Sequence, residues 1–252
     1  MSTVRVLDQL VTMSRALGMP ERDYVILAEG NTSGRAGENS FWIKASGFHL
    51  QQIGPEGFVE VRFDAVMSLL GRNQDESDMS HALLSARVDS YAKNRPSIEA
   101  TMHAVIYAMC GANFIGHTHP TAVNAILCAQ GYQEALTGRL FPDHIVFCGA
   151  VPAIVPYVEP GAPLARQVQR TLEVYLDAHG RSPKTIFLQN HGLIALAQTA
   201  AEVESIIAMT VKSCRVLLGT VGFGGPHFLS QADIERIDTH PSELFRRKQA
   251  GF

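Results

Sequence analysis

Short apolar segments alternate with amphipathic segments along the whole chain of 252 residues. Apolar runs rich in β-branched residues and bounded by Gly, Pro or Asn are typical of strands, whereas apolar residues three and four positions apart are typical of helices. Several predicted strands follow one another after short connections, and parallel neighbours would need a longer crossover. The sequence therefore predicts one α/β domain in which helices flank a mixed or antiparallel sheet.

The element boundaries follow from the periodicity and from Gly and Pro. The predicted helices span residues 3–17, 64–70 with Asp64 as cap, 75–94 as a helix or helical turn, 97–110, 120–130, 162–179, 200–219 capped by Thr199, and 231–248. The predicted strands span residues 24–27, 40–44, 57–63, 112–119, 144–149, 151–158 and, as a pair or one bent strand, 184–198. We expect the polar segment EGNTSGR, between the first two strands, to be a loop.

Two histidines one residue apart, His117 and His119, end the predicted strand at 112–119. Residues i and i+2 of a strand point to the same side of the sheet, so both imidazoles face one space. His191 also ends an apolar strand and precedes a glycine, which makes it the best candidate for a third ligand. Catalytic zinc usually has three protein ligands and one open position. The pattern predicts a metal site, although a pair of hydrogen-bonded, half-buried histidines would give the same H-x-H sequence.

Glu99 lies in the first turn of the predicted helix at 97–110, after Pro96 and Ser97. A carboxylate there can simply favour the positive end of the helix, which contributes about 0.3–1 kcal/mol. It can also project into the metal crevice as an acid/base, and both interpretations stay open. His103 lies one turn further along the same face, where it could orient Glu99 or belong to the core.

Two segments rich in small polar residues, EGNTSGR and KASG, could hold an anion. Exposed backbone N–H groups with Ser, Thr or Asn side chains form anion nests, and a helix N-terminus attracts the same groups. The candidate residues for a phosphate or carboxylate are Gly30, Asn31, Ser33, Ser46, Gly47 and Ser97. Turns use the same residue types, so neither segment alone defines such a site.

Five segments occur together in this order: EGNTSGR, WIKASG, RPSIEATMHA, GHTHPTAV and QNHGLIA. With this set the chain resembles the class II aldolase/adducin family, typified by the L-fuculose-phosphate and L-rhamnulose-phosphate aldolases and L-ribulose-phosphate 4-epimerase. The resemblance implies a central, mainly antiparallel β-sheet sandwiched by α-helices, in a homotetramer with active sites between subunits. We expect a single domain over residues 1–252, with 224–252 as a C-terminal extension. The first half is especially similar to the aldolase part of bifunctional aldolase/dehydrogenase proteins, and we expect no dehydrogenase domain before Phe252.

By this resemblance, His117, His119 and His191 are zinc ligands and Glu99 is the catalytic carboxylate. The implied phosphate-holding positions are Gly30, Asn31, Ser46, Gly47 and Ser97. The implied reaction is retro-aldol cleavage of a ketose phosphate to dihydroxyacetone phosphate and an aldehyde. In it zinc stabilises an enediolate as a Lewis acid, and Glu99 moves the proton. Another divalent metal could replace zinc, since three imidazoles suit several ions.

Two positions depart from the family pattern. Ile98 stands where the aldolases carry a second serine before the acid, which leaves open whether the substrate is phosphorylated. The tyrosine that acts near the leaving alkoxide in the fuculose-phosphate enzyme has no clear match in LFPDHIVFCG. Asp143 or His144 could replace it, although a surface turn also explains both. An epimerase, dehydratase or decarboxylase acting on a related sugar phosphate or sugar acid is the alternative hypothesis, and a non-catalytic adducin-like binding domain is a third.

Charge and cysteine content narrow the classes of partner. A formal net charge of -3 gives no strong field for nucleic acid or an anionic membrane. Arg5 and Asp8 interrupt the apolar pattern of the N-terminus, and no apolar stretch approaches the roughly 18 residues needed to span a bilayer, so we expect neither a signal peptide nor a membrane span. The four cysteines are far apart in the sequence and form no C-x-x-C pair, which is typical of reduced thiols in the cytoplasm. We therefore expect a cytoplasmic protein with a small-molecule substrate, no nucleic acid and no membrane.

Overall fold

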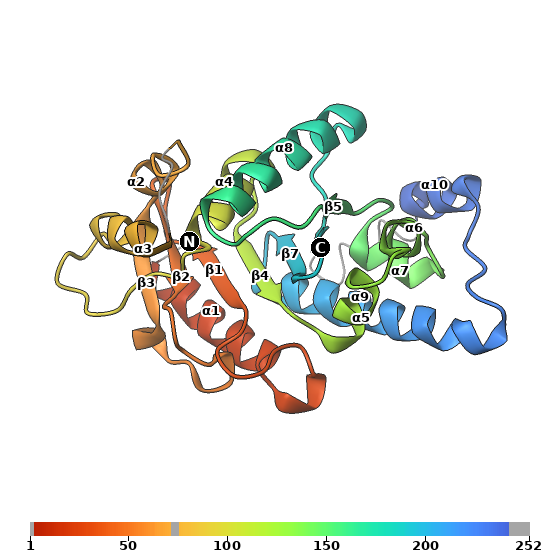
Figure 1. Ribbon diagram of the computed structural model, residues 1–252, viewed down its shortest axis with the longest axis horizontal. Helices are drawn as coiled ribbons and strands as arrows, with labels where there is room; N and C mark the ends of the chain where they lie inside the picture. Colours follow the sequence, from red (N-terminus) through yellow and green to blue (C-terminus); the bar gives the residue numbers. More distant parts are fainter. Residues whose placement is uncertain (1–2, 72–75, 242–252) are drawn as a thin grey trace.

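The computed structural model describes residues 3–71 and 76–241, and a seven-stranded sheet forms its centre (Figure 1). The strand order is β3-β2-β1-β4-β7-β6-β5. Neighbouring strands are antiparallel except for β5 and β6, which are parallel. The strands are β1 Asn31–Arg35, β2 Ser40–Lys44, β3 Phe58–Arg62, β4 Phe114–Thr118, β5 Ala153–Val155, β6 Thr185–Leu188 and β7 Gly192–Ala197. The prediction of an α/β fold with a mainly antiparallel central sheet is confirmed.

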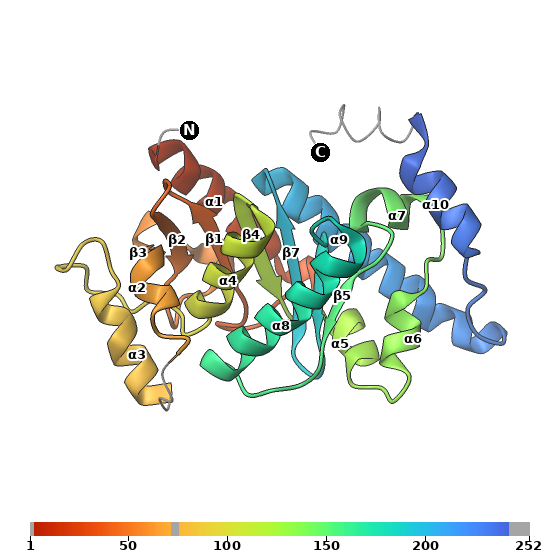
Figure 2. The same ribbon diagram turned by 90° about the horizontal axis from the view of Figure 1, so that it is seen from above.

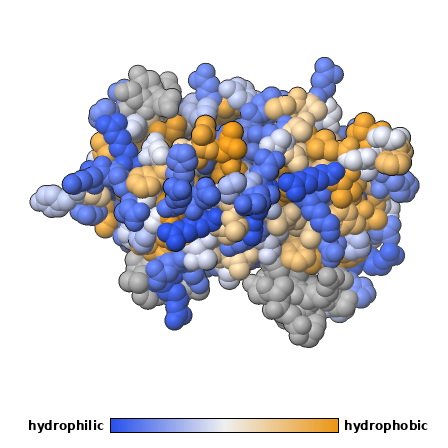
Figure 3. All heavy atoms as spheres, turned by 90° about the horizontal axis from the view of Figure 1, so that it is seen from below, coloured by the Kyte–Doolittle hydropathy of each residue, from blue (hydrophilic) through white to orange (hydrophobic). Residues whose placement is uncertain are grey.

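Helices cover both faces of this sheet. The helices are α1 Thr3–Leu17, α2 Phe63–Met67, α3 Glu76–Ser85, α4 Ala100–Cys110, α5 Thr121–Leu127, α6 Tyr132–Thr137, α7 Pro142–Cys148, α8 Ala162–His179, α9 Ala200–Thr220 and α10 Gln231–Thr239. Figure 1 shows α4 and α8 above the sheet and α1, α5 and α9 below it, and the view from above has α4 and α8 in front (Figure 2). Apolar and hydrophilic side chains are interspersed on the face seen from below (Figure 3).

The alternation of β4 decides which way its histidine points. Ile115 packs in the core cluster of α4 and α8, whereas Phe114 packs in the cluster of α1 and α9. Because successive strand residues face opposite sides, His117 lies on the same face as Ile115 and turns toward α4. In the register of the sheet His117 is opposite Asn31 of β1 and Ile194 of β7. The end of β4 and the beginnings of β1 and α4 therefore meet at one edge.

The prediction of a loop at EGNTSGR is wrong, because Asn31–Arg35 is the central strand β1. Its polar side chains are buried on both faces and paired. Thr32 Oγ1 lies 2.6 Å from Ser14 Oγ of α1, and Ser33 Oγ lies 2.6 Å from His103 Nδ1 of α4. With polar residues on both sides, the strand has no apolar alternation to recognise. The strand predicted at 24–27 is also absent; this segment is a turn in which Leu27 has φ 53°.

Other boundaries differ for local reasons. Residues 144–149, predicted as a strand from their β-branched residues, belong to helix α7, which begins with Pro142 at its first position. α2 begins at Phe63 after Arg62, so Asp64 lies inside the helix, where its carboxylate accepts the N–H of Ala65. The helix α6 was not predicted. α10 ends at Thr239, and the predicted continuation to Lys248 lies mostly outside the described residues.

The long helices were predicted well. α1 and α8 have the predicted bounds, and α8 ends at His179, followed by Gly180 with φ 63° as its C-cap. α9 is capped by Thr199, whose hydroxyl oxygen accepts the N–H of Glu202 at 3.1 Å. By length and composition alone, residues 200–223 are long and apolar enough to cross a membrane, contrary to our expectation. In this fold α9 packs against β4, β7, α1, α5 and α7, and a core helix has the same apolar composition.

Candidate metal centre and active site

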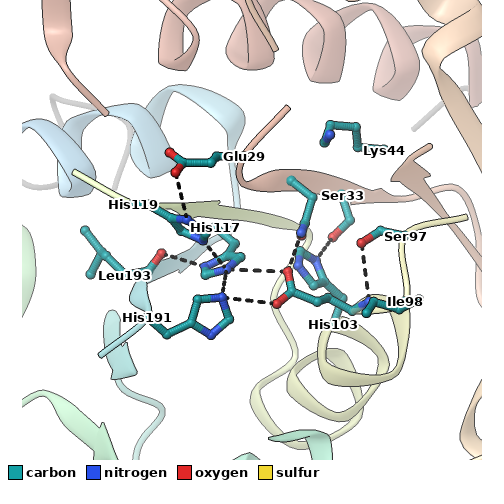
Figure 4. A network of polar contacts seen from close by, with 12 residues as sticks. Glu29, Ser33, Lys44, Ser97, Ile98, His103, His117, His119, His191 and Leu193 are labelled. Carbon is teal, nitrogen blue, oxygen red and sulfur yellow. Dashed lines mark hydrogen bonds and ion pairs between the residues drawn. The ribbon is translucent and has the colours of Figure 1, made fainter. Parts of the chain in front are cut away.

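Three histidine side chains converge at the edge where β4 ends (Figure 4). His117 is in β4, His119 follows the strand, and His191 lies in the tight turn between β6 and β7. The Nε2 atom of His117 lies 3.0 Å from Nε2 of His119 and 3.3 Å from Nε2 of His191. The turn is held by a hydrogen bond from Asn124 Nδ2 to the carbonyl of His191. The structure thus brings together the three residues that the sequence pattern selected.

The surroundings keep the imidazoles of His117 and His119 neutral. Burial, together with the neighbouring His191 and His103, holds the pKa of His117 well below its usual value. Burial and His117 lower the pKa of His119 to about 3. His117 Nδ1 lies 3.1 Å from the carbonyl oxygen of Leu193, which can only accept, so Nδ1 carries the proton and Nε2 keeps its lone pair. On the far side of His119, Nδ1 lies 4.0 Å from the Glu29 carboxylate.

This geometry fits a divalent metal ion. Nitrogens bound to one tetrahedral zinc at about 2.0–2.1 Å are about 3.3–3.4 Å apart, close to the separations of His117 Nε2 from the Nε2 atoms of His119 and His191. Neutral imidazoles are the form that binds metal, and a backbone carbonyl commonly fixes the ligand tautomer as Leu193 does here. The side chains of His119 and His191 are 19% and 15% exposed, so the cluster opens to solvent on one side. His117, His119 and His191 can therefore hold a metal with an open position.

Glu99 faces the same space. It is the residue before α4, rather than within its first turn, and its side chain is 10% exposed. Its carboxylate oxygens lie 3.4 Å from Nε2 of His117 and 3.4 Å from Nε2 of His191. Asn31 Nδ2 donates a 2.5 Å hydrogen bond to Glu99 Oε2. A carboxylate beside a metal-binding cluster can move protons at a ligand bound there.

The expected anion-binding residues lie around Glu99, but they differ in burial and in whether their polar groups are already hydrogen-bonded. Asn31 is buried and already bonded to Glu99, and Ser97 Oγ accepts the backbone N–H of Glu99 at 3.3 Å. Ser46 and Gly47 are exposed, but the N–H of Ser46 already donates to the carbonyl of Arg95. A bridge between Ala45 and Pro96 brings the Ser46 and Ser97 segments side by side.

Two glycines at this edge permit close backbone approach. Gly30 has φ 64°, and a Cβ there would lie 2.5 Å from the carbonyl oxygen of His117. A Cβ at Gly192 would lie 2.6 Å from the carbonyl oxygen of Thr118 and 2.7 Å from Cδ2 of His119. Gly192 was not singled out as functional in the sequence, although its place directly after His191 was the available signal.

Lys44 is a buried cation that the sequence reasoning missed, and only its place in the WIKASG segment pointed to it. It is 2% exposed, and its ammonium donates to the carbonyls of Ala28 and Phe48. These bonds tie the segment before β1 to the segment after β2. Burial lowers the pKa of Lys44 to about 8, and the negative Glu99 opposes this shift.

Asp143 and His144, the two candidates to replace the missing tyrosine, both lie in helix α7 and differ in burial. His144 is buried in α7, where burial and the adjacent Arg139 lower its pKa to about 3. α7 packs against α9 and α10. The prediction of a surface turn is therefore wrong for His144, and Asp143 is half-buried at the start of the same helix.

Comparison of the sequence with models of known protein families identifies its family. Residues 8–218 match the model of the family described as Class II Aldolase and Adducin N-terminal domain. This match covers most of the chain, and the fold agrees with it. The chain belongs to the class II aldolase and adducin family.

Several known proteins are similar to this chain. The Bacillus subtilis protein named "Uncharacterized oxidoreductase YuxG" is 26% identical over 202 residues, which are 77% of this chain and 27% of that protein. The chain thus spans about a quarter of the length of this relative. A solved L-fuculose 1-phosphate aldolase has a TM-score of 0.72 at 18% identity, covering 98% of both chains. YgbL from Klebsiella pneumoniae, titled a putative aldolase/epimerase/decarboxylase, has a TM-score of 0.71 at 17% identity, covering 94% of this chain and 99% of that one.

Proposed function

We propose that this protein is a metal-dependent class II aldolase that cleaves a ketose phosphate to dihydroxyacetone phosphate and an aldehyde. The observation that carries the proposal is the position of Glu99, whose two carboxylate oxygens each lie 3.4 Å from an imidazole nitrogen of the histidine cluster. With Glu99 as the acid/base, this distance supports proton transfer at a substrate bound to the ion that the cluster can hold.

In the proposed reaction, the metal ion and the protein side chains have separate roles. A bound zinc ion, or another divalent ion, would polarise the substrate carbonyl as a Lewis acid. As the C–C bond breaks, the hydroxyl of the departing carbon loses its proton to solvent and becomes the aldehyde, and Glu99, carrying a proton taken up from solvent, protonates the enediolate carbon; in the reverse direction Glu99 removes that proton. His117, His119 and His191 hold the ion, and the hydrogen bond from Asn31 fixes the carboxylate in position.

The substrate phosphate is proposed to lie against the polar segments beside Glu99. The residues proposed to hold it are Gly30, Asn31, Ser46, Gly47 and Ser97. Lys44 supplies a positive charge next to these segments and strengthens their attraction for an anion. We further propose one domain over residues 1–252 with 224–252 as an extension, a homotetramer, and a cytoplasmic location.

An assay with a panel of ketose 1-phosphates tests this function. The metal-loaded protein is incubated with each compound, and dihydroxyacetone phosphate is measured with a coupled dehydrogenase. Release with at least one compound, lost in Glu99→Gln, supports the proposal. Absence of product from every compound, with metal bound in stoichiometric amount, overturns it.

A second function is favoured by Ile98. This half-buried apolar residue stands between Ser97 and Glu99, where the aldolase pattern has a serine, so one phosphate contact is missing. Epimerisation, dehydration or decarboxylation of a related sugar phosphate or sugar acid would use the same metal and the same carboxylate. Mass spectrometry of the products separates these reactions, because loss of water or carbon dioxide changes the mass and epimerisation does not.

A further inference from the structure

Strand β1 and helix α4 face each other through matched polar side chains. On β1, Asn31 and Ser33 are two residues apart and share a face. Glu99, the residue before α4, and His103 within α4 are four residues apart and lie on the same side of the helix. Asn31 donates to Glu99 at 2.5 Å, and Ser33 Oγ lies 2.6 Å from His103 Nδ1. His103 therefore lies one helical turn behind Glu99, in the same buried layer (Figure 4).

Hydrogen-bond directions in this layer can be assigned from its inner end. Tyr107 is fully buried, and burial raises the pKa of its phenol, so the phenol keeps its hydrogen. Ser33 Oγ, at 2.7 Å, is the hydrogen-bond partner that the described residues offer to it. Tyr107 therefore donates to Ser33, and the hydroxyl hydrogen of Ser33 is left to donate to Nδ1 of His103.

These directions determine which ring nitrogen of His103 carries the hydrogen. Burial lowers the pKa of this imidazole to about 4, so the ring is neutral and carries one hydrogen. Since Nδ1 accepts from Ser33, that hydrogen is on Nε2. Nε2 is buried and has no hydrogen-bond partner among the described residues. The opposite assignment would leave two groups unpaired: one hydroxyl hydrogen, of either Tyr107 or Ser33, and the Nε2 lone pair. The negative charge of Glu99 acts on His103 and favours an N–H that faces it.

We infer that His103 is a positioning residue for Glu99: the buried chain Tyr107→Ser33→His103 fixes the Nε2–H tautomer, which presents a donor toward the Glu99 carboxylate, directly or through one buried water. Together with Asn31, this donor holds the carboxylate oriented toward the metal cluster. The tautomer and its contact are properties of the metal-free protein, whereas the effect on turnover rests on the proposed function.

Nuclear magnetic resonance of the metal-free protein, labelled with ¹⁵N-histidine, tests the structural part. Long-range ¹H–¹⁵N correlations distinguish the two neutral tautomers, and His103→Gln assigns the signal. The expected result is the Nε2–H tautomer in the wild type, with its Nε2–H resonance shifted in Glu99→Gln and unchanged in the exposed control Glu159→Gln. The Nδ1–H tautomer, or a resonance indifferent to Glu99→Gln, overturns the inference whether or not any reaction is found.

A pair of variants tests the effect on turnover. The side-chain amide of Gln can replace an Nε2–H donor, whereas the shorter Asn reaches only the position of Nδ1. We expect His103→Asn to lower kcat at least about tenfold with little change in KM, as for loss of a hydrogen bond to a charged group. His103→Gln should restore most of this loss at an equal Tm. Equal losses of kcat in both variants, in proportion to a fall in Tm, would show a purely structural role and overturn the inference.

Discussion

The side-chain amide of Asn31 donates a 2.5 Å hydrogen bond to the carboxylate of Glu99 across the space between β1 and α4. Asn31 stands opposite His117 in the sheet, so one strand residue links the proposed acid/base to the metal-binding edge. β1 pairs with a strand on each side, so the residue that holds the carboxylate is fixed within the sheet.

Removing this hydrogen bond should weaken catalysis more than stability. We expect Asn31→Ala to lower kcat about tenfold or more, since a hydrogen bond to a charged group contributes about 1.5–3 kcal/mol. Its metal content should stay at the wild-type level. Thr32→Ser is the matched control, because Thr32 faces α1 and the serine keeps the hydroxyl that meets Ser14. Equal kcat in Asn31→Ala and Thr32→Ser would contradict the proposed link.

Replacing the carboxylate itself should separate chemistry from metal binding. Loss of a general acid/base typically lowers the rate about 10²–10⁴-fold, so Glu99→Gln should lose that much turnover. His117, His119 and His191 are unchanged in this variant, so its metal stoichiometry should equal that of the wild type. Steady-state kinetics and elemental analysis of the same preparation measure both quantities. Wild-type turnover in Glu99→Gln would remove Glu99 from the mechanism.

The close backbone contacts of Gly192 predict that a side chain at this position lowers both stability and metal affinity. In Gly192→Ala the new Cβ would overlap the carbonyl oxygen of Thr118 and the ring of His119, so β7 or His119 must shift. Overpacking of this kind costs about 1–3 kcal/mol of the free energy of unfolding, and we expect weaker metal binding as well. Gly71→Ala is the control, because a Cβ at Gly71 meets no atom within 4 Å. Denaturation and metal titration of both variants should show the defect in Gly192→Ala alone.

The buried His144 predicts a pH dependence of stability that is independent of the metal cluster. Burial and Arg139 lower its pKa from 6.5 to about 3 in the folded protein, so the unfolded chain binds the extra proton between these values. Stability from this residue is therefore complete above pH 6.5 and is lost as the pH falls toward 3, by about 2 kcal/mol between pH 7.5 and pH 5. His144→Gln should show a correspondingly smaller loss over that interval in urea denaturation. The exposed control His227→Gln should follow the wild type, and an unchanged slope in His144→Gln would contradict the assignment.

The sequence predicts the histidine cluster better than it predicts the scaffold behind it. His117 and His119 were recognisable because strand alternation is a local rule, and the apolar context of His191 matched theirs. β1 was missed because Thr32 and Ser33 are paired with α1 and α4, which are distant in the sequence. Pairings of this kind leave no local period, and the same is true of the buried Lys44.

Errors in the helices have a different cause. The segment at 144–149 has the β-branched residues of a strand, but Pro142 begins a helix there and packing against α9 and α10 stabilises it. The role of Asn31 was predicted as anion binding, whereas the structure also shows its bond to Glu99. Where the local sequence was compatible with either a helix or a strand, tertiary contacts determined which one formed.

Metal analysis of the protein purified without chelator tests the central claim most directly. The wild type and the exposed control His49→Ala should each contain about one divalent ion per chain, the stoichiometry of a single three-histidine site. His117→Ala should contain none while keeping the circular dichroism spectrum of the wild type. A wild type that stays metal-free after dialysis against zinc, or a His117→Ala variant with full metal content, would show that the three histidines are not a metal site.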